Sequence, residues 1–221
     1  MTSVPEENSL DTLFSRFPAL AQSEDDIRSL AERMLRICGS GGTILTCGNG
    51  GSAADSDHVA CELMKGFLLP RQLPKSSIRT LQGKGVRAAV PAELLQRPLQ
   101  AVSLCSNAAL ITAISNDQGP DVVFAQQVLG LGSPGDLLLC LSTSGRSPSV
   151  LAAAATAKAL GLETALLTGP NPGKAAGLFD VVVAAPGDNA GEIQDMHRPV
   201  YHAICAYVER KLFGVPSDIR H

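Results

Sequence analysis

Residues 43–66, TILTCGNGGSAADSDHVACELMKG, contain the pattern that decides the fold. A short apolar run leads into a glycine-rich turn, and a stretch of helical character follows. Almost continuously hydrophobic runs are typical of strands that are buried on both faces of a parallel sheet. The sequence has such runs at 43–47, 101–105, 137–142, 164–168 and 181–184.

The segments between these runs are expected to be helical. Alternating strands and helices predict an α/β fold, here a doubly wound, mostly five-stranded parallel sheet flanked by helices. Two helices, at about 9–21 and 24–38, are expected before the first strand, and Ser23 is expected to cap the second of them. The later helices are expected at about 52–66, 107–115, 121–130, 147–160, 173–178 and 192–213.

Composition limits the class of protein. With 45% hydrophobic and 18% charged residues, the chain is globular, and 1–221 is expected to form one domain with its N-terminal helices in 1–40. A net charge of −3 argues against a nucleic-acid partner. No apolar run approaches the ~20 residues of a membrane span, and the N-terminus lacks the pattern of a signal peptide. We therefore expect a cytoplasmic protein whose cysteines are mostly reduced and buried.

The segment 68–100 interrupts the alternation of strands and helices. It holds four prolines and no clean strand pattern, and positions 70–100 contain six Lys or Arg residues against one acid, Glu93. A long irregular stretch of this kind is often functional. We interpret it as a basic insertion near the mouth of a pocket, where it would attract an anionic substrate. A solvated surface excursion without contact to the site is the alternative.

Two loops at predicted strand ends are candidates for ligand binding. The first, Asn49-Gly50-Gly51-Ser52, leads into a helix whose free N–H groups would face an anion, although a tight turn gives the same pattern. The second, 142–148 or STSGRSP, places four hydroxyls around one glycine at the start of another helix. One serine suffices for an N-cap, so the four hydroxyls favour phosphate binding.

His58 and Glu62 lie four positions apart on the helix that follows the first loop, and so on one face. Because this helix starts at the loop, both side chains are expected to point towards the ligand. A solvated carboxylate is the alternative for Glu62. Its neighbours in CELM are apolar, however, and burial is expected to raise its pKa towards that of a useful base.

Four stretches, in order, resemble the phosphoheptose isomerases of the sugar isomerase (SIS) domain family. STSGRSP is similar to the family's phosphate loop, S-T-S-G-x-S. GNGGSAADSDHVACEL, AISNDQG and EIQDMHRPVYH are similar to the corresponding stretches of these enzymes. The likeness runs from residue 10 to residue 213, with 68–100 as its main interruption. It implies a flavodoxin-like SIS domain.

The resemblance implies an aldose–ketose isomerase that converts sedoheptulose 7-phosphate to D-glycero-D-manno-heptose 7-phosphate through an enediol. This chemistry needs a base at carbon and an acid near the oxygens. By resemblance Glu62 is the base and His202 the general acid, because the family's histidine stands eight residues past the glutamine that is here Gln194. His197 is the competing histidine, and would then be a supporting or surface residue. Pro199 is expected to kink the last helix.

The resemblance also implies a metal, an assembly and a set of substrate contacts. The protein would be a homotetramer with its active site at a subunit interface and a small phosphosugar as its ligand. Zinc would be bound by His58, Glu62, Gln194 and His202. Substrate-binding residues would be Asn49, Gly50, Gly51, Ser52, Glu62, Asn116, Asp117, Ser142, Thr143, Ser144, Ser147 and Gln194.

Two alternative functions remain open from the sequence. The first is isomerisation of another phosphosugar, because Gly191 stands where some family members have a substrate-contacting Asp, and because Glu62 and Asp117 are unusually far apart for the family. The second is a non-catalytic SIS domain that binds a phosphosugar as a regulator. A regulator has no need of an acid–base pair, and Glu62 and His202 therefore favour an enzyme.

Overall fold

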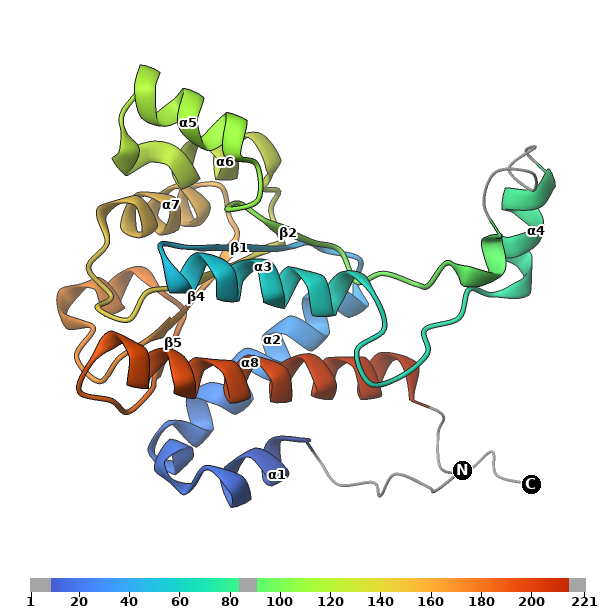
Figure 1. Ribbon diagram of the computed structural model, residues 1–221, viewed down its shortest axis with the longest axis horizontal. Coiled ribbons are helices and arrows are strands. Elements are labelled where there is room, and N and C mark those ends of the chain that lie inside the picture. Colours follow the sequence, from blue (N-terminus) through green and yellow to red (C-terminus); the bar gives the residue numbers. More distant parts are fainter. Residues whose placement is uncertain (1–8, 84–90, 215–221) are drawn as a thin grey trace.

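The computed structural model describes residues 9–83 and 91–214. In this part of the chain, five parallel strands form one sheet in the order β2-β1-β3-β4-β5 (Figure 1). The predicted doubly wound parallel sheet is therefore confirmed. The strands are β1 (Ile44–Gly48), β2 (Ala101–Ser103), β3 (Leu137–Leu141), β4 (Glu163–Thr168) and β5 (Val181–Ala184).

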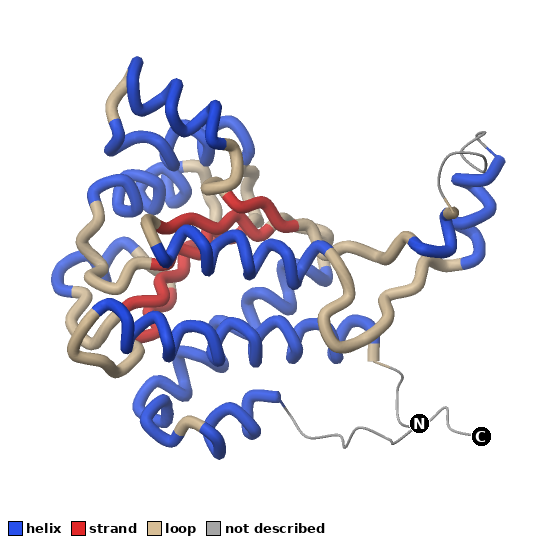
Figure 2. Tube along the Cα trace, in the orientation of Figure 1, coloured by secondary structure: helices blue, strands red, loops and turns tan. Residues whose placement is uncertain are grey.

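Helices cover both faces of the sheet (Figure 2). One face packs against α1 (Ser9–Arg16), α2 (Glu24–Gly39), α3 (Gly51–Met64) and α8 (Ala190–Phe213). The other face packs against α5 (Ala108–Asp117), α6 (Val123–Leu131) and α7 (Pro148–Ala159). Among the described helices, none combines the length and the apolar character that crossing a membrane requires.

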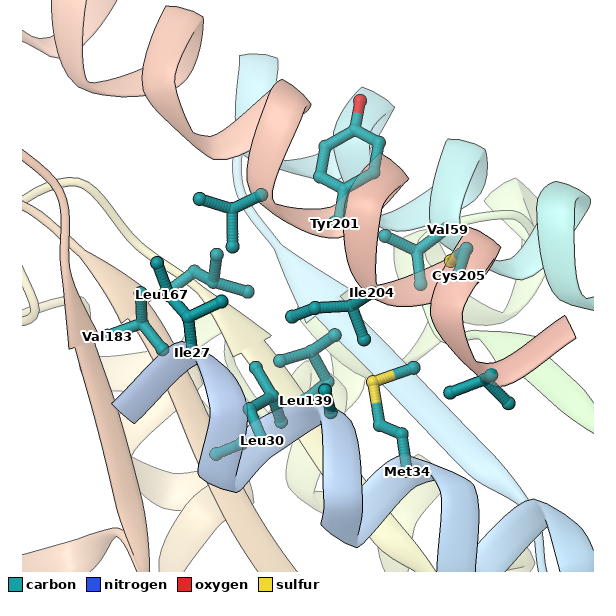
Figure 3. Close-up of a cluster of buried hydrophobic side chains, with 14 of the residues drawn as sticks. Ile27, Leu30, Met34, Val59, Leu139, Leu167, Val183, Tyr201, Ile204 and Cys205 are labelled. Carbon is teal, nitrogen blue, oxygen red and sulfur yellow. The ribbon is translucent and has the colours of Figure 1, made fainter. Parts of the chain in front are cut away.

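The central strands supply both cores by the alternation of their side chains. In β3, Leu137, Leu139 and Leu141 join the α2–α8 core, whereas Leu138 and Cys140 join the core on the opposite face. Successive side chains of a strand point to opposite faces, so a continuously apolar strand serves two cores. Figure 3 shows the first core, where side chains of α2 and α8 meet those of the sheet.

The N-terminal helix prediction needs correction. The helix expected over 9–21 ends at Arg16, and a 3-10 helix, η1 (Pro18–Ser23), follows. Proline lacks an N–H group and disfavours a helical residue before it, so α1 does not continue. Ser23 makes no side-chain cap on α2, and its hydroxyl donates instead to the carbonyl oxygen of Ala184 at 2.7 Å. This hydroxyl thus links the start of α2 to β5.

Other boundaries differ by less. The stretch 121–130 begins with a 3-10 turn, η4 (Pro120–Val122), before α6, and 173–178 is a 3-10 helix, η5 (Gly173–Leu178). Strand β2 ends at Ser103 rather than at 105. The last helix, α8, continues through Pro199 without a break.

The insertion contains an arm that projects from the body of the molecule (Figure 1). An antiparallel bridge between Gln72 and Gln96 closes its base. Contrary to the irregular structure expected, the arm includes a helix, α4 (Lys75–Gly83), and a 3-10 turn, η3 (Ala92–Leu94). No residue of α4 is buried. Two of the segment's basic residues, Lys84 and Arg87, lie outside the described residues.

The base of the arm is fixed by a fully buried ion pair. Arg71 donates through Nε to Glu209 of α8 at 2.6 Å, and both side chains are 0% exposed. The other guanidinium nitrogens donate to the carbonyl oxygens of Leu63 and Glu62 at 2.5 and 3.0 Å. Glu209 also accepts the N–H groups of Phe67, Leu68 and Leu69. One carboxylate and one guanidinium therefore hold the last turn of α3, the following loop and α8 together.

The six cysteines are all free, as expected. Cys38, Cys47, Cys140 and Cys205 are buried, and burial raises the pKa of Cys38 to about 12. Cys61 is exposed and Cys105 half-buried, so burial is not general. The buried thiols act as small apolar side chains.

Candidate active site

The two candidate loops follow adjacent strands. Gly48, the last residue of β1, pairs with Leu141, the last residue of β3. The chain leaves β1 towards β2 on one side and returns to β3 on the other, so the strand order reverses between them. Open α/β sheets bind ligands at this point, beyond the carboxyl ends of the strands. The sheet therefore places the glycine loop (49–52) and the serine loop (142–147) together.

The glycine loop contacts the serine loop directly. Asn49 donates through Nδ2 to the hydroxyls of Ser147 and Ser149, at 2.8 and 3.0 Å. Gly50 has a φ of +59°, a conformation that side chains rarely adopt. A Cβ at Gly51 would lie 2.7 Å from the amide of Gln194, so α8 packs on the backbone at the first turn of α3. Glycine is favoured at Gly50 by its positive φ, whereas a side chain at Gly51 would displace the amide of Gln194.

The serine loop is shaped by its backbone. The Ser142 N–H donates to the carbonyl oxygen of Leu167, and Gly145 makes the turn with a φ of +62°. Ser144 accepts the N–H of Arg146 at 3.2 Å. Ser147 stands at the N-cap position of α7 without a side-chain cap, and its hydroxyl accepts from Asn49 instead. The Ser147 hydroxyl thus contacts the glycine loop rather than capping α7.

A cluster of three ionisable side chains lies further along α3. His58 Nε2 is 3.0 Å from Glu62 Oε1 and 3.3 Å from Nε2 of His202 on α8. One ligand atom from each residue lies within 4.8 Å of the others. Imidazole nitrogens and a carboxylate are the ligands that zinc prefers, and three protein ligands leave the open position of a catalytic site. This donor set fits zinc.

The pKa of Glu62 differs in direction from the expectation. Glu62 is 7% exposed, and burial does raise its pKa, but the hydrogen bonds and positive charges of Lys65 and His58 outweigh burial, so the pKa is lowered. Lys65 Nζ lies 2.6 Å from Glu62 Oε2. The expected raised pKa was wrong because the sequence pattern showed the apolar neighbours and not the ion pair. Burial and the neighbouring His58 lower the pKa of His202.

Tyr201 and Asp55 support the cluster, and neither was predicted from the sequence. The Tyr201 hydroxyl donates to Asp55 Oδ1 at 3.0 Å and lies 3.1 Å from His58 Nδ1. Burial, then the charge and hydrogen bond of Asp55, raise the pKa of Tyr201, which therefore keeps its proton. Asp55, His58 and Glu62 are spaced i, i+3, i+7 along one helix face. That spacing was the signal in the sequence for Asp55.

Gln194 does not lie with His202. It rests against Gly51, seven residues or about two helical turns before His58 on α3. Because α3 and α8 run side by side, Gln194 meets the start of α3 and His202 meets its middle (Figure 1). His58, Glu62 and His202 lie together, and Gln194 as a fourth zinc ligand stays a prediction.

His197 is not a surface residue. It is 0% exposed, its Nε2 lies 3.2 Å from the carbonyl oxygen of Thr168, and burial lowers its pKa. Its Nδ1 and the Thr168 hydroxyl have no hydrogen-bond partner among the described residues. His197 thus lies beneath the serine loop, since a Cβ at Gly145 would be 3.1 Å from that hydroxyl.

Asn116 and Asp117, at the end of α5, are exposed. Asn116 donates to the Asp117 carboxylate at 2.8 Å. Within the described residues, no hydrogen bond joins them to the glycine loop, the serine loop or the cluster.

His202 also lines a cavity of about 570 Å³. The cavity lies between α1 and α8, and Phe17, Phe67, Leu68 and Pro199 contribute apolar surface to it. Arg16, Arg198 and Arg210 also line it. The glycine and serine loops take no part in the lining. One side of the ionisable cluster is therefore open to this cavity.

Comparison with known proteins identifies the family. Residues 10–96 and 85–169 match the model of the SIS domain. A phosphoheptose isomerase of Akkermansia muciniphila is 35% identical over 207 residues, which cover 94% of this chain and 96% of that protein.

Solved structures agree with the sequence match. A phosphoheptose isomerase from Neisseria gonorrhoeae superposes with a TM-score of 0.67 at 30% identity, covering 90% of this chain and 97% of that one. Another, from Francisella tularensis, has a TM-score of 0.69 at 28% identity, covering 92% and 100%. With its glycine and serine loops at the β1/β3 switch point and these relatives along nearly its whole length, the chain belongs to the SIS domain family, beside the phosphoheptose isomerases.

Proposed function

We propose that this phosphosugar isomerase interconverts sedoheptulose 7-phosphate and D-glycero-D-manno-heptose 7-phosphate through an enediol. The observation that carries the proposal is the meeting of Glu62, His58 and His202, on the helix that starts at the glycine loop. A regulator that only binds a phosphosugar needs the two loops and has no use for this cluster. Relatives named phosphoheptose isomerase support the choice of a heptose.

In this proposal the two loops hold the sugar phosphate. The N-terminus of α7 and the hydroxyls of Ser142, Thr143, Ser144 and Ser147 would surround the phosphate oxygens, because unpaired amides and the helix dipole favour an anion. Asn49, Gly50, Gly51, Ser52 and Gln194 would contact the sugar from the other loop. We keep Asn116 and Asp117 as substrate contacts by family resemblance alone.

The chemical step is assigned to Glu62 and His202. Glu62, ionised because Lys65 and His58 lower its pKa, takes the proton from one carbon of the substrate and returns it to the neighbouring carbon. His202, with a lowered pKa, moves a proton between the two oxygens. Both residues contact His58 in one chain, so each chain holds its own acid–base pair.

The proposal also includes a bound metal ion, an oligomeric state and a cellular location. Zinc held by His58, Glu62 and His202 would supply Lewis-acid polarisation of the substrate oxygens. We propose a homotetramer in which a neighbouring subunit covers the open side of the cluster at the α1–α8 cavity. Six free cysteines support a cytoplasmic location, where thiols stay reduced.

The variant Glu62→Gln tests the proposal. It keeps the shape of the side chain but cannot accept a proton, so we expect isomerisation to be lost while phosphosugar binding persists. The assay incubates the protein with pentose, hexose and heptose phosphates and follows exchange of the C1 proton by NMR. Glu93→Gln, an exposed glutamate of the arm, is the matched control and should keep wild-type turnover. Wild-type turnover in Glu62→Gln would refute the assigned base, and turnover of a pentose or hexose phosphate alone would refute the heptose.

A further inference from the structure

Tyr201 occupies a position between a carboxylate and a histidine of the cluster. Its side chain is 1% exposed, and Figure 3 shows the ring rising from α8 with its oxygen directed away from the aliphatic core. That oxygen lies 3.0 Å from Asp55 Oδ1 and 3.1 Å from His58 Nδ1. Asp55 and His58 are three residues apart on α3, so one phenol oxygen contacts two successive turns of the neighbouring helix.

The single phenol proton decides the protonation of His58. The carboxylate of Asp55 has only acceptor oxygens, so the Tyr201 hydroxyl donates to it. Arg198, which also interacts with Tyr201, is a donor only and cannot take that proton. The remaining lone pair of the phenol oxygen faces His58 Nδ1. A hydrogen bond between the two therefore requires the proton on Nδ1.

We propose that Asp55 and Tyr201 are positioning residues that keep a proton on Nδ1 of His58, so that Nε2 is the ring nitrogen left to bind a metal beside Glu62 and His202. This inference rests on the proposed zinc site and deepens it. It assigns Nε2 as the ligand atom of His58. Metal-binding histidines commonly donate their other N–H to a carboxylate or a carbonyl, which fixes the ring and its tautomer. Here a tyrosine stands between the histidine and the carboxylate.

The distances around Nε2 agree with this assignment. Nε2 of His58 lies 3.0 Å from Glu62 Oε1 and 3.3 Å from His202 Nε2, and without a metal a proton on Nε2 makes the hydrogen bond to Glu62. Acceptor atoms this close repel one another unless a cation or a proton lies between them. Lys65 already serves the other carboxylate oxygen, Oε2, at 2.6 Å. We call the contacts from Asp55 through Tyr201 to His58 the relay. The relay thus leaves three acceptor atoms facing a single point, as a metal site requires.

The phenol hydroxyl can be removed without removing the ring. Tyr201→Phe keeps the aromatic packing on α8 and deletes only the oxygen that joins Asp55 to His58. The chain contains two tyrosines, and both lie on α8. Tyr207→Phe is therefore a matched control, because its hydroxyl donates to Glu32, away from the cluster. Urea unfolding of both variants, measured first, shows that they are folded.

Zinc affinity is the first readout, measured by competition with a chelator of known affinity. We expect Tyr201→Phe to bind zinc about 10- to 100-fold more weakly than the wild type, the usual effect of losing a residue that orients a metal ligand. Tyr207→Phe should bind as the wild type does. An affinity of Tyr201→Phe within twofold of the wild type would overturn the relay while leaving the zinc site in place.

The tautomer itself is the second readout, which does not depend on metal or on activity. Long-range ¹H–¹⁵N correlation spectra of protein labelled in histidine distinguish a protonated from an unprotonated ring nitrogen, and His58→Gln assigns the signals. In metal-free wild type we expect Nδ1 of His58 to be protonated, and in Tyr201→Phe a mixture of tautomers. A wild-type Nδ1 without a proton would refute the relay. If the wild type binds no zinc, the metal part of the proposed function fails, and this spectrum still decides the relay.

Discussion

The two ends of α3 are built in different ways. At its start, Gly51 and Ser52 belong to a site of backbone groups, small hydroxyls and amides that follow β1 and β3. Ten residues later, about 15 Å along the helix axis, Glu62 belongs to a cluster of ionisable side chains shared with α8. The first site suits an anion that must be held, and the second suits protons that must be moved.

The comparison shows what each kind of site depends on. The loops are neighbours because β1 and β3 are neighbours, and the sheet fixes that relation. The cluster depends on how α3 packs against α8, two helices that are more than a hundred residues apart in the sequence. We therefore expect mutations near the cluster to act through long-range contacts, and mutations in the loops to act locally on substrate binding.

The largest expected effect is on stability at the cluster end of α3. Arg71→Leu leaves the buried carboxylate of Glu209 without its counter-ion and frees the carbonyl oxygens of Glu62 and Leu63. Breaking a buried ion pair from one side costs about 3–5 kcal/mol of the free energy of unfolding. Urea denaturation measures this loss, and turnover at a permissive temperature should fall because the last turn of α3 carries Glu62.

Arg97→Leu is the control for this experiment. Its guanidinium lies 4.7 Å from the Phe213 ring centroid, close to the 5.1 Å of Arg71, but Arg97 is exposed. We expect a change below about 1 kcal/mol, as for most surface substitutions. Equal losses for both arginines would show that the ring contact, and not the buried ion pair, holds this end of α3.

The second effect is on substrate affinity at the loop end. In Ser144→Ala/Ser147→Ala, two hydroxyls that we assign to phosphate binding are lost, at about 1 kcal/mol each and more if the partner is charged. The KM should rise about 30-fold or more, since 1.4 kcal/mol is a factor of ten, while kcat changes little. If kcat fell by as large a factor as KM rose, the loops would also take part in the chemical step, and the assignment of binding to the loops and of catalysis to the cluster would be wrong. Ser149→Ala is the control, because the Ser149 hydroxyl also accepts a hydrogen bond from Asn49 but is not assigned to the phosphate. It shows how much of the rise in KM comes from the lost contact between the two loops alone.

The smallest effect concerns pH and His197, which is buried on α8 beside Thr168. Burial lowers the pKa of His197 below its ordinary 6.5, so the unfolded chain binds the proton before the folded one does. The contribution of His197 to the free energy of unfolding is therefore fully present above pH 6.5. It falls as the pH drops from there to the pKa of the folded state, by up to about 1.4 kcal/mol per pH unit.

Urea unfolding of metal-free protein at several pH values between 7.5 and 5 tests this sign. His197→Gln should flatten the dependence by the share that belongs to His197, leaving the share of His202, whose pKa is also lowered. A slope that is the same in His197→Gln and in the wild type would exclude His197 as its source.

Much of the fold was predictable because it follows from local patterns. The buried strands were predicted within two residues, and the glycine and serine loops lie where the parallel sheet requires. His58 and Glu62 were predicted on one face of α3, and they are in contact. The arm was less predictable, since α4 is a helix of nine residues none of which is buried, and it stands in a segment with four prolines.

The errors share a physical cause. Ser23 bonds to Ala184 instead of capping α2, and Glu62 is paired with Lys65, which reverses the expected shift of its pKa. Each of these outcomes depends on a particular partner and its distance. A pattern of residue types along the chain gives the face on which a side chain lies, but not which group it meets.

By itself the sequence determined the strands, their alternation with helices and the positions of the two loops at strand ends, because apolar periodicity and backbone requirements are local properties. Only the tertiary structure decided that His202 meets His58, that Tyr201 joins Asp55 to the same histidine, and that Arg71 and Glu209 lock the end of α3. These contacts join residues 138 to 146 positions apart. The packing of α3 against α8 creates them, and that packing depends on the shape of the whole core.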